Sequence, residues 1–334
     1  MTDSRVAPPH CESTPARDGR PGVLLINLGT PDAPTRTAVR RYLAEFLSDP
    51  RLIDLPRILW LPILHGIVLN VRPERTARAY AEVWRKDTNE SPLRYYTRRQ
   101  AERLQERLGA GAIVDWAMRY GTPSIGERLA ALRAAGAARV IVLPLYPQYS
   151  ATTTASVEDA VNRSRSSSNC FAVLPAFFGH PSYIAALKTN ALRQLAGLAE
   201  PPQRVLLSFH GLPQRYVDRG DPYSAQCAAT SALLRHAMEW GGDFAPMTFQ
   251  SKFGPGAWLE PSTEQTLVAL GKKGVKRVAV LTPGFVADCI ETLEEIAIRA
   301  RATFLNAGGE ELTSLSCLND TDDMIDLLET LARH

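Results

Sequence analysis

The sequence predicts an α/β protein with two similar domains, each a doubly wound parallel sheet covered by helices, and a cleft between them. Three observations favour this fold class. The chain has 334 residues, more than one ordinary hydrophobic core holds, which indicates two domains. Short apolar runs alternate with helical patterns, as they do in sheets built from βαβ units. Two of the apolar runs also resemble each other in detail.

These two runs are Gly22–Leu28 and Val205–His210. Both are too short for a helix and read as strands buried on both faces of a parallel sheet. Each is followed by a glycine and, two residues later, by a proline. A second pair, Arg139–Leu143 and Arg277–Leu281, is placed in the same way in the two halves. We therefore expect two domains of the same construction, with a chance match of short apolar strands as the alternative.

The same alternation sets the expected domain bounds. Residues 1–21 are rich in proline and charge and lack the apolar stretch of a signal peptide, so we expect a disordered tail there. The first domain is expected at 22–145 and the second at 146–311. The last segment, 312–334, is expected to be helical and to pack back on the first domain. Helical spacing of apolar residues predicts helices at Thr37–Leu47, Arg98–Leu108, Ser124–Ala135, Glu158–Arg165, Tyr183–Leu198 and Met324–Arg333.

Bulk composition argues against several classes of function. The net charge is +3 and the basic residues are scattered, which does not indicate binding to nucleic acid. The glycines after the strands form neither G-x-G-x-x-G nor G-x-x-x-x-G-K-[ST], so no nucleotide phosphate loop is predicted. The five cysteines are far apart and show no metal-ligand spacing. Free thiols in a reducing compartment, hence a cytoplasmic protein, are expected.

The most apolar window of the chain is Leu52–Val71. It is interrupted by Asp54, Pro56 and Pro62, so it lacks the ~20 nearly continuous apolar residues that span a bilayer. We expect a core-facing segment here. The alternative is a lip that touches a membrane or forms the wall of a ligand pocket.

The main candidate for chemistry is His210, which stands where the strand Val205–His210 ends. In open α/β sheets, ligands bind just outside the carboxyl ends of the strands. Glu291 follows another strand end in the same half. Asp288 with Glu291 three residues on has capping-box spacing, so a helix is expected to begin with Asp288 as its N-cap. Glu295 lies one turn further along the same helix face.

An imidazole and a carboxylate that converge on one cleft suit two kinds of chemistry. They can remove protons from a bound molecule. They are also ligand types that iron(II) accepts, and only two protein ligands leave open positions on the metal. From the residues alone, a metal-handling pair of His210 and Glu291 is one hypothesis. The alternative is two separate structural roles, in which Glu291 only caps its helix.

Arg119 and Tyr120 end another predicted strand. The guanidinium can clamp a carboxylate of a ligand while the ring stacks on its flat face. The alternative for Arg119 is an ion pair at the protein surface, which is common and contributes little.

Several longer stretches occur in a fixed order along the chain. They read L-I-N-L-G-T-P-D-A-P-T at Leu25–Thr35, A-M-R-Y-G-T-P-S at 117–124, L-P-L-Y-P-Q-Y-S at 143–150, F-H-G-L-P-Q-R-Y at 209–216 and G-F-V-A-D-C-I-E-T-L-E-E-I at 284–296. On these motifs the chain resembles the ferrochelatase family, specifically its enterobacterial-type branch, from about Gly22 to the C-terminus. Long motifs in a conserved order are far more specific than one short pattern.

The resemblance implies two Rossmann-like domains in the chelatase fold, with a porphyrin cleft between them. It also implies a lyase that inserts Fe(II) into protoporphyrin IX, forming protohaem with release of two protons, the last step of haem biosynthesis. His210 matches the family's active-site histidine and Glu291 its paired glutamate, both also described as iron ligands. Glu295 continues an acidic line that would guide metal or protons. The positions that match porphyrin contacts are Leu28, Arg119 and Tyr120.

Three departures from the family pattern limit what can be carried over. Many relatives have a histidine where this chain has Cys289, so a second base is not expected there. Arg299 stands where others carry an acid, which shortens the acidic line. Some relatives bind an iron–sulfur cluster through a cysteine at the position of Ala151 and a C-terminal cysteine group. This chain has only Cys317 near its end, so no cluster is expected.

Two other functions stay open at this point. One is chelation with another porphyrin, such as coproporphyrin III, or another metal. The other is a non-catalytic haem or tetrapyrrole carrier, which would need no base. The acid-lined helix opposite His210 favours the enzyme. The expected partners are protoporphyrin IX and Fe(II), without nucleic acid. We expect a cytoplasmic monomer with peripheral membrane contact through residues 52–71.

Overall fold

The computed structural model describes residues 19–165, 170–254 and 256–333. The predicted tail at 1–21 therefore lies outside the described residues except for its last three. These three already belong to the fold, because the carbonyl of Pro21 accepts a hydrogen bond of 2.9 Å from Ile113 and that of Arg20 accepts one of 3.1 Å from Ala138. The expected end of the tail is thus three residues too late.

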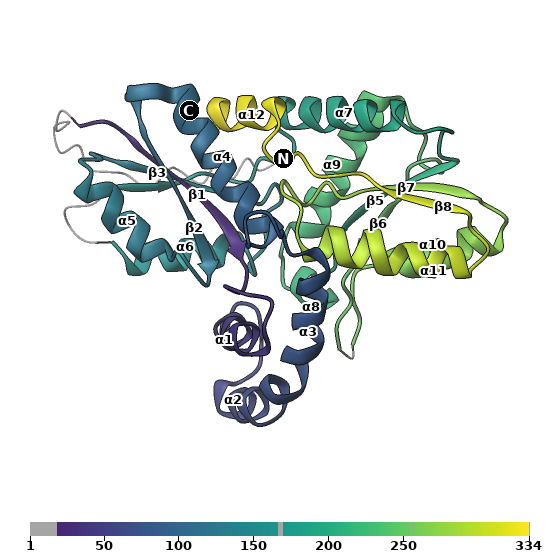
Figure 1. The fold of residues 1–334 in the computed structure, drawn as a ribbon, viewed down its shortest axis with the longest axis horizontal. Coiled ribbons are helices and arrows are strands. Elements are labelled where there is room, and N and C mark those ends of the chain that lie inside the picture. Colours follow the sequence, from purple (N-terminus) through teal and green to yellow (C-terminus); the bar gives the residue numbers. More distant parts are fainter. Residues whose placement is uncertain (1–18, 166–169, 255, 334) are drawn as a thin grey trace.

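Two parallel sheets of four strands each form the centre of the molecule (Figure 1). The first has the order β2-β1-β3-β4 and the second the order β6-β5-β7-β8, which is the same arrangement repeated. This confirms the predicted fold class and the internal similarity, since the two matched runs are the central strands β1 and β5. The strands are β1 (Gly22–Gly29), β2 (Ile113–Tyr120), β3 (Val140–Pro144), β4 (Phe171–Val173), β5 (Arg204–His210), β6 (Met247–Gln250), β7 (Arg277–Leu281) and β8 (Glu311–Ser314).

The glycine at the end of each central strand has a steric reason. A Cβ on Gly29 would lie 1.9 Å from the carbonyl oxygen of Tyr120, the end of β2, and Gly29 has φ +119. A Cβ on Gly211 would lie 2.6 Å from the carbonyl oxygen of Gln250, the end of β6. In both halves the central strand therefore passes its neighbour too closely for any side chain.

Helices cover both faces of the sheets. The predicted helix at Ser124–Ala135 is α5, which starts with a capping box: Ser124 accepts from the backbone of Glu127, and the Glu127 carboxylate accepts from the backbone of Ser124. The helices are α1 (Arg36–Leu47), α2 (Arg57–Ile63), the π-helix η1 (Leu64–Val68), α3 (Leu69–Val83), α4 (Pro92–Leu108), the 3₁₀ turn η2 (Gly109–Gly111), α5 (Ile125–Ala134), α6 (Thr154–Arg163), α7 (Pro181–Ala196), α8 (Gln214–Asp218), α9 (Tyr223–Met238), α10 (Thr263–Lys272), the π-helix η3 (Glu291–Ala300), α11 (Arg301–Asn306) and α12 (Asp322–Ala332).

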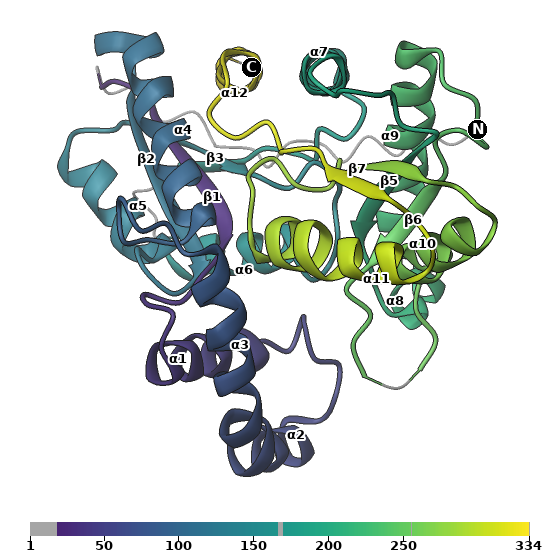
Figure 2. The same ribbon diagram turned by 45° about the vertical axis from the view of Figure 1, so that its right-hand side comes forward.

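The apolar window at 52–71 forms a projecting arm, made of α2, η1 and α3 (Figures 1 and 2). Its core-facing prediction holds for Leu64 and Leu69, which are fully buried, but it is wrong for much of α2, where Ile58 is 83% exposed. The prolines do not stop the helix. The carbonyl of Leu69, which the missing N–H of Pro73 leaves open, accepts a hydrogen bond of 3.2 Å from Nε of Arg40 instead.

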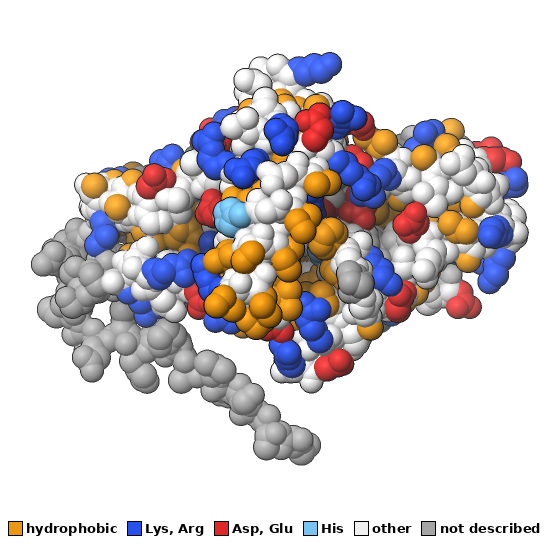
Figure 3. All heavy atoms as spheres, turned by 90° about the horizontal axis from the view of Figure 1, so that it is seen from below, with side chains coloured by type: hydrophobic (Ala, Val, Ile, Leu, Met, Phe, Trp, Pro, Cys, Tyr) orange, Lys and Arg blue, Asp and Glu red, His pale blue; other side chains and the backbone are white. Residues whose placement is uncertain are grey.

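The exposed face of the arm is apolar. Figure 3 shows hydrophobic side chains gathered on the lower face of the molecule, with arginine and lysine side chains around them. The large exposed hydrophobic side chains of this region are Leu55, Ile58, Leu59, Ile63, Ile67 and Val71. None of the helices that the structure describes is both long and apolar enough to cross a bilayer.

The two halves share one core and do not part at residue 145. The strand β4 pairs with β3, so residues up to Val173 belong to the first sheet and the predicted boundary at 145/146 is too early. The largest hydrophobic cluster joins Leu25 of β1, Leu207 of β5 and Leu328 of α12. Within residues 312–334, α12 packs against α4 of the first half and lies beside α7 (Figure 2).

The described cysteines depart from the prediction at one position. Cys227, Cys289 and Cys317 are free and buried. Cys170 is disulfide-bonded, so the expectation of free thiols is wrong there. Cys11 lies outside the described residues.

Candidate active site

His210 ends β5 with its side chain exposed and its ring orientation fixed. Nδ1 lies 2.7 Å from the carbonyl oxygen of Gly211, and because a carbonyl only accepts, Nδ1 carries the proton and donates. The hydroxyl of Tyr223 donates to the backbone carbonyl of His210 at 2.9 Å. The ring of Phe285 lies 6.5 Å away, centroid to centroid. Nε2 of His210 is thereby left as the nitrogen with a free lone pair, which can accept a proton or bind a metal.

Glu291 begins the π-helix η3, which follows β7. The helix starts without the predicted capping box. Oδ1 of Asp288 accepts hydrogen bonds from Thr292 and from the backbone of Cys317, and Oδ2 accepts from Asn319. Ile290, the residue before the helix, makes no side-chain cap, and the backbone N–H of Asp288, which Glu291 would bond in a capping box, donates to Asn319 instead. The carboxylate of Glu291 is therefore not committed to capping its own helix.

Gln250 connects the two candidate residues. It pairs with His210 in the register of β5 and β6. Its Nε2 donates 2.9 Å to the carbonyl oxygen of Glu291, and its Oε1 accepts 2.7 Å from the hydroxyl of Ser208. Gln250 is 4% exposed. The ends of β5 and β6 and the first residue of η3 thus form one hydrogen-bonded unit, as expected for ligand sites at the carboxyl edge of a parallel sheet.

The first half of the chain supplies the surroundings of Glu291. Burial raises the pKa of Tyr42 and of Tyr80, and the negative charge of Glu291 raises both further. Burial lowers the pKa of Arg72, while Glu291 is among the groups that raise it. The guanidinium of Arg72 stacks 4.3 Å above the ring of Phe253 from the second half. Tyr42, Tyr80 and Arg72, which the sequence did not single out, therefore lie within electrostatic range of Glu291.

The carboxylate of Glu295, one turn further along η3, is hydrogen-bonded to the loop that follows β6. It accepts hydrogen bonds from the backbone and the hydroxyl of Ser251, at 2.7 and 2.5 Å. Ser251 has φ +65, a conformation that non-glycine residues rarely adopt. Arg299 lies 3.8 Å from Glu295 and 2.9 Å from Glu294. The acidic line thus ends at a cation, and Glu295 holds the loop that follows β6.

Arg119 and Tyr120 form a buried polar cluster with Asp49 and Ser156. Nη2 of Arg119 lies 2.5 Å from Oδ2 of Asp49, and the two side chains are 11% and 6% exposed, so this ion pair is not at the surface. The hydroxyl of Tyr120 donates to Asp49 at 2.7 Å, and Nε of Arg119 donates to the hydroxyl of Ser156 at 2.7 Å. The predicted porphyrin contact stays a prediction, and here the polar atoms of both residues are already bonded to protein groups.

Leu28 lies at the end of β1, half-buried, against the hydrophobic cluster that joins α1, the arm and Tyr120. Ile290, the residue before Glu291, packs against the same cluster. Leu28 and the start of η3 therefore border one apolar region where the two halves meet.

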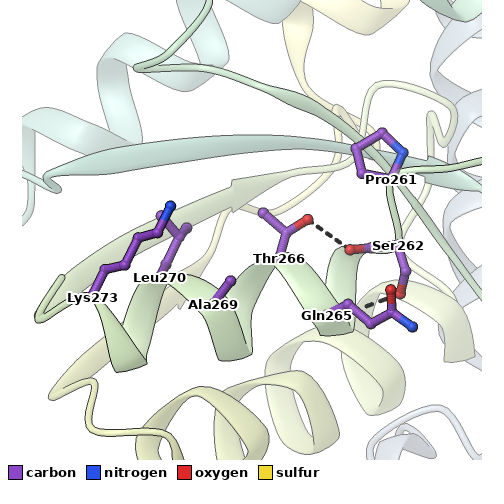
Figure 4. Close-up of a pocket in the computed structure, with 7 residues that line it drawn as sticks. All are labelled: Pro261, Ser262, Gln265, Thr266, Ala269, Leu270 and Lys273. Atoms are coloured by element: carbon purple, nitrogen blue, oxygen red, sulfur yellow. Dashed lines mark hydrogen bonds between the residues drawn. The ribbon is translucent and has the colours of Figure 1, made fainter.

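The structure has two hollows away from His210 and Glu291. One of about 380 Å³ is bordered by the end of α3, the start of α4 and the turn before η3, with Arg85, Tyr96, Asp288 and Leu293 in its wall. The other, of about 290 Å³, lies over α10 between Pro261 and Lys273 (Figure 4). Neither is lined by His210 or Glu291.

No group of three or more His, Cys, Asp or Glu side chains that could hold a metal occurs among the described residues.

The fold of this chain is similar to that of solved chelatases. SirB from Bacillus subtilis with Fe3+ is similar with a TM-score of 0.53 at 12% identity, covering 94% of each chain. The sirohydrochlorin chelatase SirB from Bacillus subtilis subspecies spizizenii in complex with cobalt has a TM-score of 0.52 at 12% identity, again covering 94% of each. At this identity the likeness concerns the fold alone.

Sequence comparison assigns the family within this class. The family model described as Ferrochelatase matches residues 20–334. The ferrochelatase of Rhizobium meliloti (strain 1021) is 49% identical over 320 residues, covering 94% of this chain and 94% of the relative. That of Brucella ovis is 48% identical over 326 residues, covering 96% of this chain and 92% of the relative. The chain belongs to the ferrochelatase family, a family of lyases of haem biosynthesis, as the motifs predicted.

Proposed function

We propose that this protein inserts Fe(II) into protoporphyrin IX to form protohaem and two protons. The observation that carries the proposal is the placement of Gln250. It is paired in register with His210, an exposed histidine whose Nδ1–H is held by Gly211, and it donates to the backbone carbonyl of Glu291, the first residue of η3. A ring nitrogen oriented through its partner nitrogen is the usual arrangement of histidines that bind metals or move protons.

The chemistry requires a base, because two pyrrole N–H protons must leave before the four nitrogens close around the metal. His210 accepts one pyrrole proton at Nε2, passes it to solvent from its exposed position, and then accepts the second. Glu291 helps to strip water from iron and stabilises the imidazolium that forms on His210. Either face of the macrocycle can meet His210 in this scheme. Iron is the substrate here, so two weakly committed ligands suit a metal that must be released into the product.

The neighbouring residues complete the proposed site. Leu28 contacts the flat face of the macrocycle. Arg119 and Tyr120 form the wall beneath it through the cluster with Asp49. Glu295 stands on the proposed approach of iron or exit of protons and also fixes the loop at Ser251.

No iron–sulfur cluster is part of this proposal. Ala151 stands where the relatives that bind an iron–sulfur cluster have a cysteine. Its backbone N–H donates to the carboxylate of Asp221 at 2.8 Å. The thiol of Cys317 is 5% exposed and lies 3.5 Å from the hydroxyl of Thr282.

The apolar face of the arm supports a proposed peripheral contact with a membrane. Protoporphyrin IX is itself largely apolar, so a cytoplasmic monomer that rests on a bilayer surface has its substrate and product within reach. A contiguous exposed hydrophobic face is the feature that such surfaces require.

The test is anaerobic incubation of the protein with protoporphyrin IX and Fe(II), with the absorption spectrum followed as haem forms. Conversion faster than in buffer supports the proposal. A carrier would bind the porphyrin and leave it metal-free. Parallel reactions with coproporphyrin III and with Co(II) separate the proposed reaction from chelation of another porphyrin or metal.

A further inference from the structure

Asn319 is a buried residue between β8 and α12 that bonds to three parts of the protein. It is 8% exposed and has φ +52. Its Oδ1 accepts from the backbone N–H of Asp288 at 2.8 Å, and its Nδ2 donates to Oδ2 of Asp288 at 2.7 Å. Its own N–H donates to the carbonyl of Val286 at 2.8 Å. The carboxamide of Asn319 thus forms hydrogen bonds with both the backbone and the carboxylate of Asp288.

Asp288 connects Asn319 to the start of η3 through further hydrogen bonds. The carboxylate is 4% exposed, and the donors that the structure gives it are neutral: Asn319, Thr292 and the backbone of Cys317. Thr292 follows Glu291 directly in η3; its hydroxyl donates 2.9 Å to Oδ1 of Asp288 and accepts 3.1 Å from the backbone N–H of Cys289. Asp288 is thus bonded to the first turn of η3, next to Glu291.

The other side of Asn319 is tied to the first half of the molecule. Its carbonyl accepts 2.6 Å from Nε2 of Gln100 on α4. The following residues are joined to α4 by ion pairs, Arg103 with Asp322 at 2.5 Å and Arg107 with Asp326 at 2.6 Å. Because β8 belongs to the second sheet and α4 covers the first, Asn319 lies where the C-terminal segment crosses between them (Figure 2).

We propose that Asn319 is a positioning residue for the reaction: by holding Asp288 at two points, it fixes the first turn of η3 and so the carboxylate of Glu291 relative to His210. The inference rests on the proposed function. It assigns a catalytic consequence to a residue outside the proposed contacts with iron and porphyrin, and it gives a reason for the bonds of the buried Asp288 to neutral donors.

The experiment compares Asn319→Ala with a matched control, Asn190→Ala. Asn190 is 2% exposed, and its Nδ2 donates 2.8 Å to Ser316 in the same C-terminal segment, but it does not bond to Asp288. Both variants lose a buried carboxamide. We expect kcat of Asn319→Ala to fall at least about tenfold, as is usual when a group that orients a ligand is removed. KM for porphyrin should stay within about twofold, and Asn190→Ala should match the wild type.

A second pair of variants separates positioning from general damage. Asn319→Asp sets two carboxylates 2.7 Å apart and Asp288→Asn sets two amide donors together, so each alone should be inactive or nearly so. The combined exchange, Asp288→Asn with Asn319→Asp, restores every hydrogen bond with the charge moved by one side chain. We expect it to recover most of the lost kcat. Hydrogen exchange at residues 288–293 should rise in Asn319→Ala and return to the wild-type level in the exchange variant.

The outcomes are distinguishable from those for the function itself. If the wild type does not metallate protoporphyrin IX, the proposed function fails. If the wild type is active and Asn319→Ala keeps kcat within twofold of Asn190→Ala, only the positioning role fails. An exchange variant no more active than Asn319→Asp would also overturn it.

Discussion

Nε2 of Gln250 donates a 2.9 Å hydrogen bond to the carbonyl oxygen of Glu291, and Gln250 is also the residue paired with His210 across β5 and β6. The two proposed catalytic residues, distant in sequence, are thus joined through a single buried side chain. Its Oε1 is held in turn by Ser208, two residues before His210. This connection gives the first prediction.

Gln250→Leu should slow metal insertion by roughly tenfold, because the start of η3 loses its bond to the strand that carries His210. Stopped-flow measurement of haem formation checks this. Gln148→Leu is the control, since it removes another buried carboxamide, one that bonds to Thr230 and to the carbonyl of Pro283. A rate for Gln250→Leu equal to that of the control would show that the bridge does not matter for catalysis.

The exposed face of the arm gives a prediction about membranes. Ile58 and Val71 are 83% and 72% exposed, so replacing both by Asp should leave the free energy of unfolding nearly unchanged. Vesicle binding should weaken at least tenfold, because burying each aliphatic side chain contributes about 1.5–3 kcal/mol. Co-sedimentation with phosphatidylcholine–phosphatidylglycerol vesicles measures this. Leu192→Asp on α7, 48% exposed, is the control. Unchanged binding of the double variant would remove the arm as the contact surface.

The cluster around Asp49 predicts a pH-dependent part of the stability. Burial alone would raise the pKa of Asp49, but hydrogen bonds from Ser156, Arg51 and Tyr120 and the charge of Arg119 outweigh it and lower the pKa. A lowered carboxyl pKa contributes stability above the unfolded value of about 3.9, and this stability is lost as the pH falls through the folded value. Urea unfolding of the wild type at a series of pH values, from about 3 to about 7, measures this pH-dependent part of the free energy of unfolding.

Asp49→Asn should cost about 3 kcal/mol near neutral pH, since Arg119 loses its buried partner, and should flatten the acid side of the curve. Asp159→Asn is the control. Its pKa is also lowered, first by the hydrogen bond from Arg51, but its side chain is 39% exposed. That variant should lose less than about 1 kcal/mol. Equal losses in the two variants would contradict the importance of burial.

The close approach at Gly29 predicts a large steric effect. Gly29→Ala would place Cβ 1.9 Å from the carbonyl of Tyr120 at φ +119, so β1 and β2 must separate. We expect a loss above about 3 kcal/mol in the free energy of unfolding, within the range of the most damaging single changes. Gly136→Ala, with φ +89 but open space, carries only the backbone penalty. Thermal unfolding of the two variants should therefore differ clearly, and similar melting temperatures would count against the steric argument.

Local patterns in the sequence were enough for the sheets and for the position of His210. The glycine that follows β1 and β5 marks the same close strand approach in both halves, and the Ser124–Glu127 capping box forms as its spacing predicts. These features depend on residues a few positions apart, which is why the sequence reveals them.

Features that depend on distant partners were missed. Asp288 has the spacing of an N-cap, but Asn319 and the backbone of Cys317 are better-placed donors, and they approach only when β8 returns beside β7. The apolar window was expected to face the core, but much of α2 is exposed. The helix continues past Pro73 because the open carbonyl of Leu69 accepts a hydrogen bond from Arg40 of α1, a partner that local sequence does not show. Arg72 was overlooked for the same reason, since its neighbours Phe253 and Glu291 come from the other half.

The central claim is that His210 is the base that takes pyrrole protons during iron insertion. The most direct measurement is single-turnover formation of haem under anaerobic conditions by the wild type and by His210→Ala, with protoporphyrin IX affinity measured separately by fluorescence quenching. The account predicts a loss of at least about a hundredfold in the rate, as expected for a positioned base, with porphyrin affinity within about twofold. A His210→Ala variant that forms haem at nearly the wild-type rate would contradict it.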